Sequence, residues 1–170
     1  TLINYFKKFS NKIELINNNN FIKKLSCRNK KVVVLSGGND LYKFKQNKIN
    51  LDREIYERKL IKFCLLNKIK LIGICKGFQQ IGEVFKFNFI KVNKHVRKNH
   101  KIFSKEKKEK YLNVNSYHNY AIVKTNKNFK DLYVSKDGSV EASINIKKNI
   151  LGLMFHPERK NLDQKKVNKF

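Results

Sequence analysis

Short runs of apolar, often β-branched residues predict buried strands at three points of this chain. They lie at residues 31–35, 71–75 and 150–155. Over residues 111–146 apolar and polar positions alternate in shorter stretches, which predicts further strands. An Asp-Gly pair at 137–138 is a turn signal between two of them.

Apolar residues at helical spacing predict helices over residues 1–9, 51–67 and 76–87. From residue 31 onward the order is strand, helix, strand, helix, which is typical of parallel strands with helices on their faces. We therefore predict an α/β fold, a three-layer sandwich with a mainly parallel central sheet flanked by helices. In the helix at 51–67, the residues expected to face the core are Leu51, Ile55, Leu60, Ile61, Cys64 and Leu65.

The segment 91–110 breaks these patterns, because it is polar and strongly basic. We interpret it as a solvated basic loop. The alternative is that His95, Arg97 and His100 contact an anionic leaving group such as a phosphate.

Length and composition indicate a single globular domain over residues 1–170, with 41% hydrophobic residues. The three cysteines, Cys27, Cys64 and Cys75, include no CxxC pair, which argues against a disulfide framework or a thiolate metal site. No apolar run approaches the roughly 20 residues that a membrane span needs. We expect a cytoplasmic protein that does not bind membranes.

The net charge of +26 has two explanations. One is an anionic partner such as nucleic acid. The other is a lysine-rich composition imposed on the whole sequence. We favour the second, because the lysines are spread over every segment and no nucleic-acid-binding motif is present. The positive field should still attract anionic small molecules.

The stretch LIGICKGFQQ, residues 71–80, has the layout of a nucleophile elbow, in which a strand turns sharply into a helix. Cys75 stands at the junction, and Gly73 and Gly77 allow strand and helix to approach closely. The helix N-terminus would favour the thiolate form of the cysteine. The alternative is that Cys75 is an inert buried residue.

Two further motifs supply what a thiol nucleophile needs. His156 and Glu158 follow the strand at 150–155, and their spacing suits a base and the group that orients it. Gly37 and Gly38 form a loop after the strand at 31–35, free of bulky side chains and suited to donating backbone N–H groups to an oxyanion.

The motifs GGND, GICKGFQ and HPE, in this order, resemble the class I glutamine amidotransferase family, in particular its gamma-glutamyl hydrolase branch. The resemblance covers about residues 32–160 and implies a flavodoxin-like fold with a Cys-His-Glu triad. It makes Cys75 the nucleophile, His156 the general base and acid, and Glu158 its orienting partner. It places the oxyanion hole at the backbone N–H groups of Gly38 and Lys76.

The resemblance also implies a small-molecule gamma-glutamyl substrate and no cofactor or metal. SGGNDLY, NSYHNYAI, FSKEK and FHPER are similar to a hydrolase of this branch that removes glutamate from a nucleotide-linked phosphoramidate in capsular polysaccharide modification. The residues implied in substrate binding are Gly37, Asn39, Gln79, Ser116, Tyr117 and His118.

Two alternatives to a hydrolase stay open. One is a glutaminase domain that supplies ammonia to a synthetase partner. The other is a non-catalytic basic binding module. The family normally opens with a strand before its first helix, whereas residue 1 already lies in a predicted helix. We therefore expect a domain truncated at its N-terminus and lacking its first strand.

Overall fold

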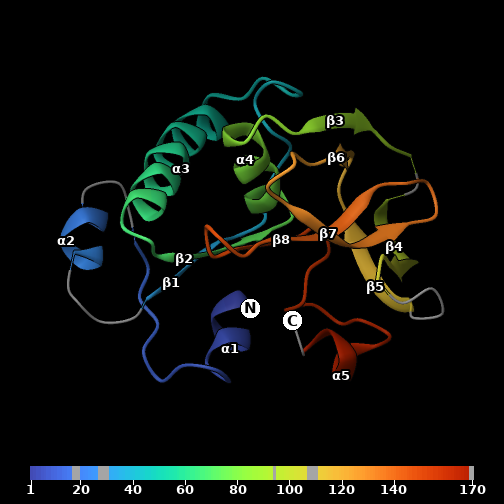
Figure 1. Cartoon of the computed structure of the whole chain (residues 1–170). Helices are drawn as coiled ribbons and strands as arrows, with labels where there is room; N and C mark the ends of the chain where they lie inside the picture. Colours follow the sequence, from blue (N-terminus) through green and yellow to red (C-terminus); the bar gives the residue numbers. More distant parts are fainter. Residues whose placement is uncertain (17–19, 27–30, 94, 107–110, 169–170) are drawn as a thin grey trace.

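The computed structural model describes residues 1–16, 20–26, 31–93, 95–106 and 111–168. Cys27 and the end of the basic segment, at 107–110, lie outside these residues. The elements of Figure 1 are α1 (Leu2–Phe6), α2 (Phe21–Leu25), β1 (Val32–Leu35), α3 (Lys48–Leu66), β2 (Lys70–Ile74), α4 (Lys76–Val84), β3 (Asn88–Lys91), β4 (Val96–Ser104), β5 (Tyr111–Tyr117), β6 (Tyr120–Lys124), β7 (Lys130–Ser135), β8 (Val140–Asn145), β9 (Ile150–Leu153) and α5 (Gln164–Val167).

One sheet joins the described strands in the order β1-β2-β9-β8-β7-β4-β5, and β6 pairs with both β8 and β3. β1, β2 and β9 run parallel, and the other pairings are antiparallel. The α/β fold with flanking helices is confirmed, but the sheet is more mixed than predicted. The helix α3 connects β1 to β2 and allows them to pair in parallel, whereas tight turns favour antiparallel pairing later in the chain.

The helices lie on both sides of the sheet (Figure 1). α3 and α4 cover one face of its parallel part, and α1 and α5 lie on the other side with both ends of the chain. The Tyr5 hydroxyl donates to Asn168 Oδ1 at 3.3 Å, which links the two ends. A large apolar cluster fills the space under α3 and α4 and includes Val33, Leu35, Leu60, Ile61, Cys64, Leu71, Phe78 and Ile81.

The predicted helix at 51–67 is confirmed as α3, but its buried face differs from the prediction. Ile55 is 45% exposed, whereas Glu54 and Glu57 are buried. The buried stripe continues through the predicted Leu60, Ile61 and Cys64. The reason is that the first turns of α3 face polar groups of the loop after β1 rather than apolar core.

The basic segment at 91–110 is not a solvated loop where it is described. It forms β4, which pairs with β5 and β7. His95 is buried and His100 is half-buried, while Arg97 is exposed. The lysines of this strand face solvent, so the segment reads as a loop although its backbone is paired in the sheet.

The predicted turn at residues 137–138 is confirmed between β7 and β8. Gly138 adopts φ 85° in the turn between β7 and β8, the conformation that favours glycine. Pro157 lies beyond the end of β9. No helix in the described part of the chain has the length and apolar character of a membrane span.

Candidate active site

Cys75 lies at the junction of β2 and α4, as expected of a nucleophile elbow. Its backbone has φ 50° and ψ −109°, a conformation that residues with a Cβ rarely adopt. Its N–H donates to the Leu153 carbonyl oxygen at 2.7 Å, and its carbonyl accepts from the N–H groups of Phe78 and Gln79. The sheet on one side and the helix on the other therefore fix this turn.

The glycines around Cys75 permit the close packing that the sequence predicts. A methyl group on Gly77 would lie 2.2 Å from the Leu35 carbonyl oxygen. One on Gly152 would lie 2.0 Å from the Phe78 ring. Both distances are far below van der Waals contact, so α4 rests directly on β1 and β9 through positions without side chains.

The Cys75 thiol is buried, with 4% of the residue exposed. Burial raises the pKa of Cys75 to about 12. The Lys76 N–H, at the start of α4, donates to the sulfur and acts in the opposite direction, while the charge of Glu141 adds to the increase. Burial of the thiol therefore opposes the thiolate form that the helix terminus favours.

His156 and Glu158 form a hydrogen-bonded pair beyond β9. His156 Nδ1 lies 2.7 Å from Glu158 Oε1. The backbone of His156 is also fixed, because its N–H donates to Asn115 Oδ1 at 2.9 Å and its carbonyl accepts from Asn115 Nδ2 at 2.8 Å. This pairing directs Nδ1 at the carboxylate and leaves Nε2 available on the other side of the ring.

The register of the parallel strands brings Cys75 and His156 to the same edge of the sheet. Ile74, the last residue of β2, pairs with Leu153, the last residue of β9. Cys75 follows β2 directly and His156 follows β9 by three residues. Glu158 and Arg159 both act electrostatically on the Cys75 thiol, so the two strand ends share one environment.

A pocket of about 380 Å³ opens at this edge. The loop after β1 approaches His156 so closely that a methyl group on Gly37 would lie 2.6 Å from its Cε1 and 3.4 Å from its Nε2. The pocket is lined by Leu2, Ser36, Gly37, Gly38, Asn39, Tyr117, His156, Glu158 and Arg159.

Arg53 of α3 holds the glycine loop in place. Its Nη1 donates to the Gly37 carbonyl at 3.1 Å and its Nη2 to the Ser36 carbonyl at 2.8 Å. Glu57, one turn along α3, accepts from Arg53 Nε at 2.7 Å. Because C=O and N–H point in opposite directions in a trans peptide, the Gly38 N–H points away from Arg53.

The model of the family described as "Glutamine amidotransferase class-I" matches residues 1–168. The chain belongs to the class I glutamine amidotransferase family. This confirms the family that the three sequence motifs predict.

Two curated relatives match about three quarters of the chain. Gamma-glutamyl-CDP-amidate hydrolase of Campylobacter jejuni subsp. jejuni serotype O:2 is 40% identical over 131 residues, or 77% of this chain. One of the subunits of glutamine-hydrolyzing GMP synthase from Methanococcus aeolicus is 28% identical over 134 residues, or 75% of this chain. Each match spans only 64% of the relative's own length.

Solved structures share the fold at low sequence identity. A Thermoplasma acidophilum protein described as one of the subunits of a GMP synthase has a TM-score of 0.76 at 18% identity, and the match covers 98% of this chain and 82% of that one. A glutamine amidotransferase from Thermotoga maritima has a TM-score of 0.61 at 20% identity, with 75% of this chain and 56% of that one covered. These likenesses support the amidotransferase fold.

The six residues that the resemblance implies in substrate binding fall into two groups in this amidotransferase domain. Gly37, Asn39 and Tyr117 line the pocket, and the Tyr117 ring lies edge-on to His156 with 5.6 Å between centroids. The other three are buried and engaged within the protein. Gln79 donates to the Tyr120 carbonyl at 2.7 Å, Ser116 donates to the His95 carbonyl at 2.6 Å, and His118 lies beside Glu141.

Sequence reasoning missed Arg53 and Arg159 as parts of the site, and it placed Asn115 in a loop at the pocket without its contact to His156. Arg159 lies over the Tyr117 ring, 4.2 Å from its centroid, and follows the HPE motif directly. The i,i+4 spacing of Arg53 and Glu57 was a usable signal, because an ion pair on a helix has this spacing. Nothing local in the sequence shows that Asn115 reaches His156.

Proposed function

We propose that this chain hydrolyses a gamma-glutamyl amide bond and releases glutamate, with Cys75 as the nucleophile. One observation carries the proposal. A cysteine on a fixed, strained turn at the end of β2 shares a sheet edge with a histidine that is oriented by a carboxylate. The 40% identity to gamma-glutamyl-CDP-amidate hydrolase supports the choice of bond.

The first step is attack of the Cys75 sulfur on the gamma-carbonyl carbon. Because burial raises the pKa of the thiol, His156 accepts the thiol proton as the carbon–sulfur bond forms. Glu158 stabilises the resulting imidazolium and holds its Nδ1–H, so that Nε2 faces the reacting groups. Burial of the thiol thus makes the base a requirement of this mechanism.

The tetrahedral intermediate then carries an oxyanion, which the Gly38 and Lys76 N–H groups are suited to bind. Lys76 N is the first backbone N–H of α4 and lies beside the Cys75 sulfur, and the Gly38 N–H is directed away from Arg53 by the hydrogen bond at Gly37. Both donors are part of the fixed backbone and need no reorganisation when the charge forms.

Collapse of the intermediate breaks the carbon–nitrogen bond, and His156 delivers its proton to the leaving nitrogen. A gamma-glutamyl thioester remains on Cys75. Water then attacks the thioester carbonyl, His156 takes a proton from it, and the thiol leaves with that proton. The balance is one amide and one water converted to glutamate and a free amine or phosphoramidate.

Residues at the mouth of the pocket suit an anionic leaving group. Arg159 is 46% exposed in its side chain and stacks on Tyr117, so its guanidinium is positioned at the rim. We extend the proposal to a nucleotide-linked phosphoramidate such as gamma-glutamyl-CDP-amidate, formed during capsular polysaccharide modification. Asn39 and Tyr117 would contact the gamma-glutamyl group, with Gln79, Ser116 and His118 shaping the pocket from behind.

A second function is favoured by one observation, the match to part of a glutamine-hydrolyzing GMP synthase. In that case the same Cys75 chemistry would act on glutamine, and the ammonia would pass to a synthetase partner. The two functions differ in substrate and in dependence on a partner.

The deciding experiment measures glutamate release from three substrates by the isolated protein: glutamine, a simple gamma-glutamyl amine and a gamma-glutamyl phosphoramidate nucleotide. We expect fastest turnover of the nucleotide with no partner present. Cys75→Ala should abolish turnover and retain substrate binding. Glu158→Gln should lower kcat by on the order of 10⁴-fold, the loss seen when a serine triad's carboxylate becomes an amide.

Cys64→Ala serves as the matched control, because Cys64 is a buried thiol in α3 that packs within the apolar cluster. It should retain turnover. Hydrolysis that survives Cys75→Ala would overturn the mechanism. Turnover of glutamine alone, and only after addition of a synthetase, would favour the second function.

A further inference from the structure

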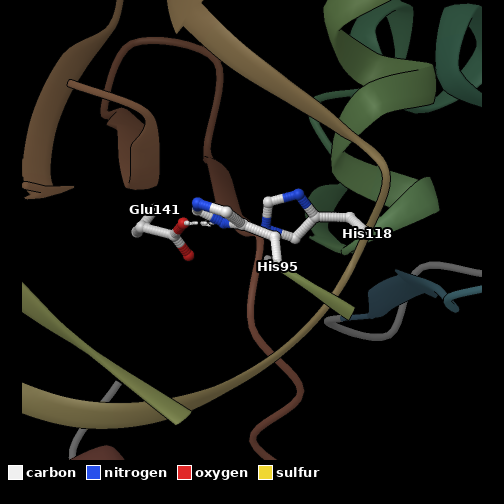
Figure 2. Close-up of side chains that lie close together, drawn as sticks. All are labelled: His95, His118 and Glu141. Carbon is white, nitrogen blue, oxygen red and sulfur yellow. Dashed lines mark ion pairs between the residues drawn. The ribbon is translucent and has the colours of Figure 1, made fainter. Parts of the chain in front are cut away.

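Glu141 of β8 is surrounded by three of the four histidines of the chain. Its Oε1 lies 3.5 Å from His100 Nε2, 3.6 Å from His118 Nε2 and 4.0 Å from His95 Nδ1. Figure 2 shows the carboxylate of Glu141 directed at the rings of His95 and His118. The side chains come from β8, from β4, from just before β4 and from the turn after β5, so the fold assembles a cluster dispersed in sequence.

The polar atoms that face each other in this cluster lack hydrogen-bond partners among the described residues. They are both Glu141 oxygens, both His118 ring nitrogens, His95 Nδ1 and His100 Nε2. Glu141 is 0% exposed, His118 2% and His95 6%. Burial of unpartnered polar groups is costly, and several at one point indicate a missing ligand that accepts them together.

The orientation of His95 is also fixed from outside the cluster. Its Nε2 lies 2.8 Å from Asp137 Oδ2, which leaves Nδ1 directed toward Glu141. Asp137 is held in turn by the Ser139 N–H at 3.0 Å and by the Ser135 hydroxyl. A carboxylate on the far nitrogen of a histidine is the usual support of a metal-binding imidazole.

We propose that His95, His118 and Glu141, with His100 as the fourth ligand, bind one divalent transition-metal ion, for which Zn²⁺ is the best match. Zinc accepts imidazole nitrogen and carboxylate oxygen at about 2.0–2.2 Å, which in a tetrahedron places ligand atoms roughly 3.3–3.5 Å apart. The separations of 3.5, 3.6 and 4.0 Å around Oε1 need only small side-chain adjustments to reach this spacing.

The ligand set favours zinc over the hard cations. Three imidazoles and one carboxylate suit Zn²⁺ and its neighbours, whereas Mg²⁺ and Ca²⁺ prefer oxygen ligands. Among the described residues, His95, His118 and Glu141 form a group of side chains that could hold a metal ion. Their ligand atoms lie within 4.8 Å of one another. A four-ligand buried site is closed, so its role is structural rather than catalytic.

A small cation explains the cluster better than part of the substrate does. None of the four residues belongs to the described lining of the pocket at His156. The metal would instead join β4, β8 and the turn after β5. That turn follows Tyr117, whose ring contacts His156, so the metal would stabilise one wall of the active site.

The test is Zn²⁺ binding to the chelator-treated protein. Binding is measured by isothermal titration calorimetry and by metal analysis after dialysis. We expect one equivalent per chain and a higher Tm with Zn²⁺ than without it. Co²⁺ in place of Zn²⁺ should give the absorption of a nitrogen- and oxygen-coordinated tetrahedral ion. His118→Ala and Glu141→Gln should each abolish stoichiometric binding.

His156→Ala and Cys75→Ala are the matched controls, because they alter the remaining histidine and the active-site thiol. Both should bind Zn²⁺ like the unaltered protein. Asp137→Asn leaves all four ligands in place and tests the site even if the ligand variants do not fold. It should weaken binding about 10–100-fold.

Three results would overturn the proposal. They are substoichiometric Zn²⁺ binding by the unaltered protein, binding unchanged in folded His118→Ala or in Asp137→Asn, and binding lost on Cys75→Ala. The last would place the metal on the thiol. These readouts do not depend on hydrolytic activity, so they are independent of the function proposed for Cys75.

Discussion

The backbone of Cys75 concentrates the local strain of the active site in one residue. A non-glycine residue at positive φ costs of order 1–3 kcal/mol and persists only where its surroundings enforce it. Here the Leu153 carbonyl and the start of α4 enforce it from both sides. This backbone conformation holds the Cys75 sulfur beside the Lys76 N–H before any substrate binds.

The raised pKa of Cys75 predicts an unusual pH profile of alkylation. From its ordinary value of 9.0 the pKa rises to about 12, so the thiolate fraction at neutral pH falls about a thousandfold. We expect the rate of Cys75 modification by iodoacetamide, followed by peptide mass spectrometry, to rise steadily from pH 7 to beyond the ordinary pKa of a thiol. In the urea-unfolded chain the same cysteine should level off near that ordinary pKa. A folded-state rate that is already constant near neutral pH would instead indicate a preformed thiolate–imidazolium pair.

Single residues with local signals were predictable from sequence, and residues with distant partners were not. The sequence alone points to Cys75, because it follows a strand and lies between two glycines. It also points to His156 and Glu158, which follow another strand two residues apart. Asn115 acts through a residue 41 positions away. Glu141 contacts histidines from two other segments of the chain, residues 95–100 and residue 118, so no short window of sequence contains the whole cluster.

At the level of elements, the position of Cys75 depends on how closely α4 packs on β1. Gly77→Ala would add a methyl group 2.2 Å from the Leu35 carbonyl oxygen, a backbone atom within the sheet. The helix must then move, so we expect a loss of about 1–3 kcal/mol in the free energy of unfolding. Because Gly77 is two residues from Cys75, glutamate release should fall as well. Urea unfolding and the hydrolysis assay measure the two effects.

Gly82→Ala is the matched control on the same helix. Its methyl group would meet the Phe87 and Phe89 rings at 2.8 Å, and side chains relax more easily than backbone. The gain in helix propensity offsets part of that cost, up to about 1 kcal/mol. We expect a smaller stability change and retained activity. Equal losses in both variants would show that the contact with β1 has no special role.

The sequence predicted elements well where the buried side chains are apolar, and poorly where buried side chains are polar. β1, β2, β9 and α4 follow from runs of apolar residues. In α3 the buried stripe includes Glu54 and Glu57, because Glu54 accepts from the Tyr42 N–H and Glu57 from Arg53. Charged residues in a sequence are normally assigned to solvent, so such a face cannot be recognised before its partners are placed.

On the scale of the whole molecule, the pocket and the histidine cluster lie in different parts of the sheet. The loops after the parallel strands β1 and β9 line the pocket, and β2 lies between these strands and ends at Cys75. The antiparallel strands β4, β5 and β8 enclose the histidine cluster. β8 and β9 are paired, and the Met154 N–H donates to the Glu141 carbonyl at 2.8 Å. The two sites are therefore joined through one antiparallel pair of strands.

The net charge of +26 predicts how ionic strength acts on the proposed reaction. A field of this sign raises the local concentration of an anionic substrate and speeds its association. From about 0.01 M to about 1 M ionic strength the Debye length falls from about 30 Å to about 3 Å, which removes the long-range part of that field. We expect kcat/KM for a gamma-glutamyl phosphoramidate nucleotide to fall about 10-fold or more over this range. For a gamma-glutamyl amide with an uncharged leaving group it should change little, since its remaining charges balance. Equal salt dependence for both substrates would mean that the positive surface does not select the leaving group, and recognition would then rest on the pocket alone.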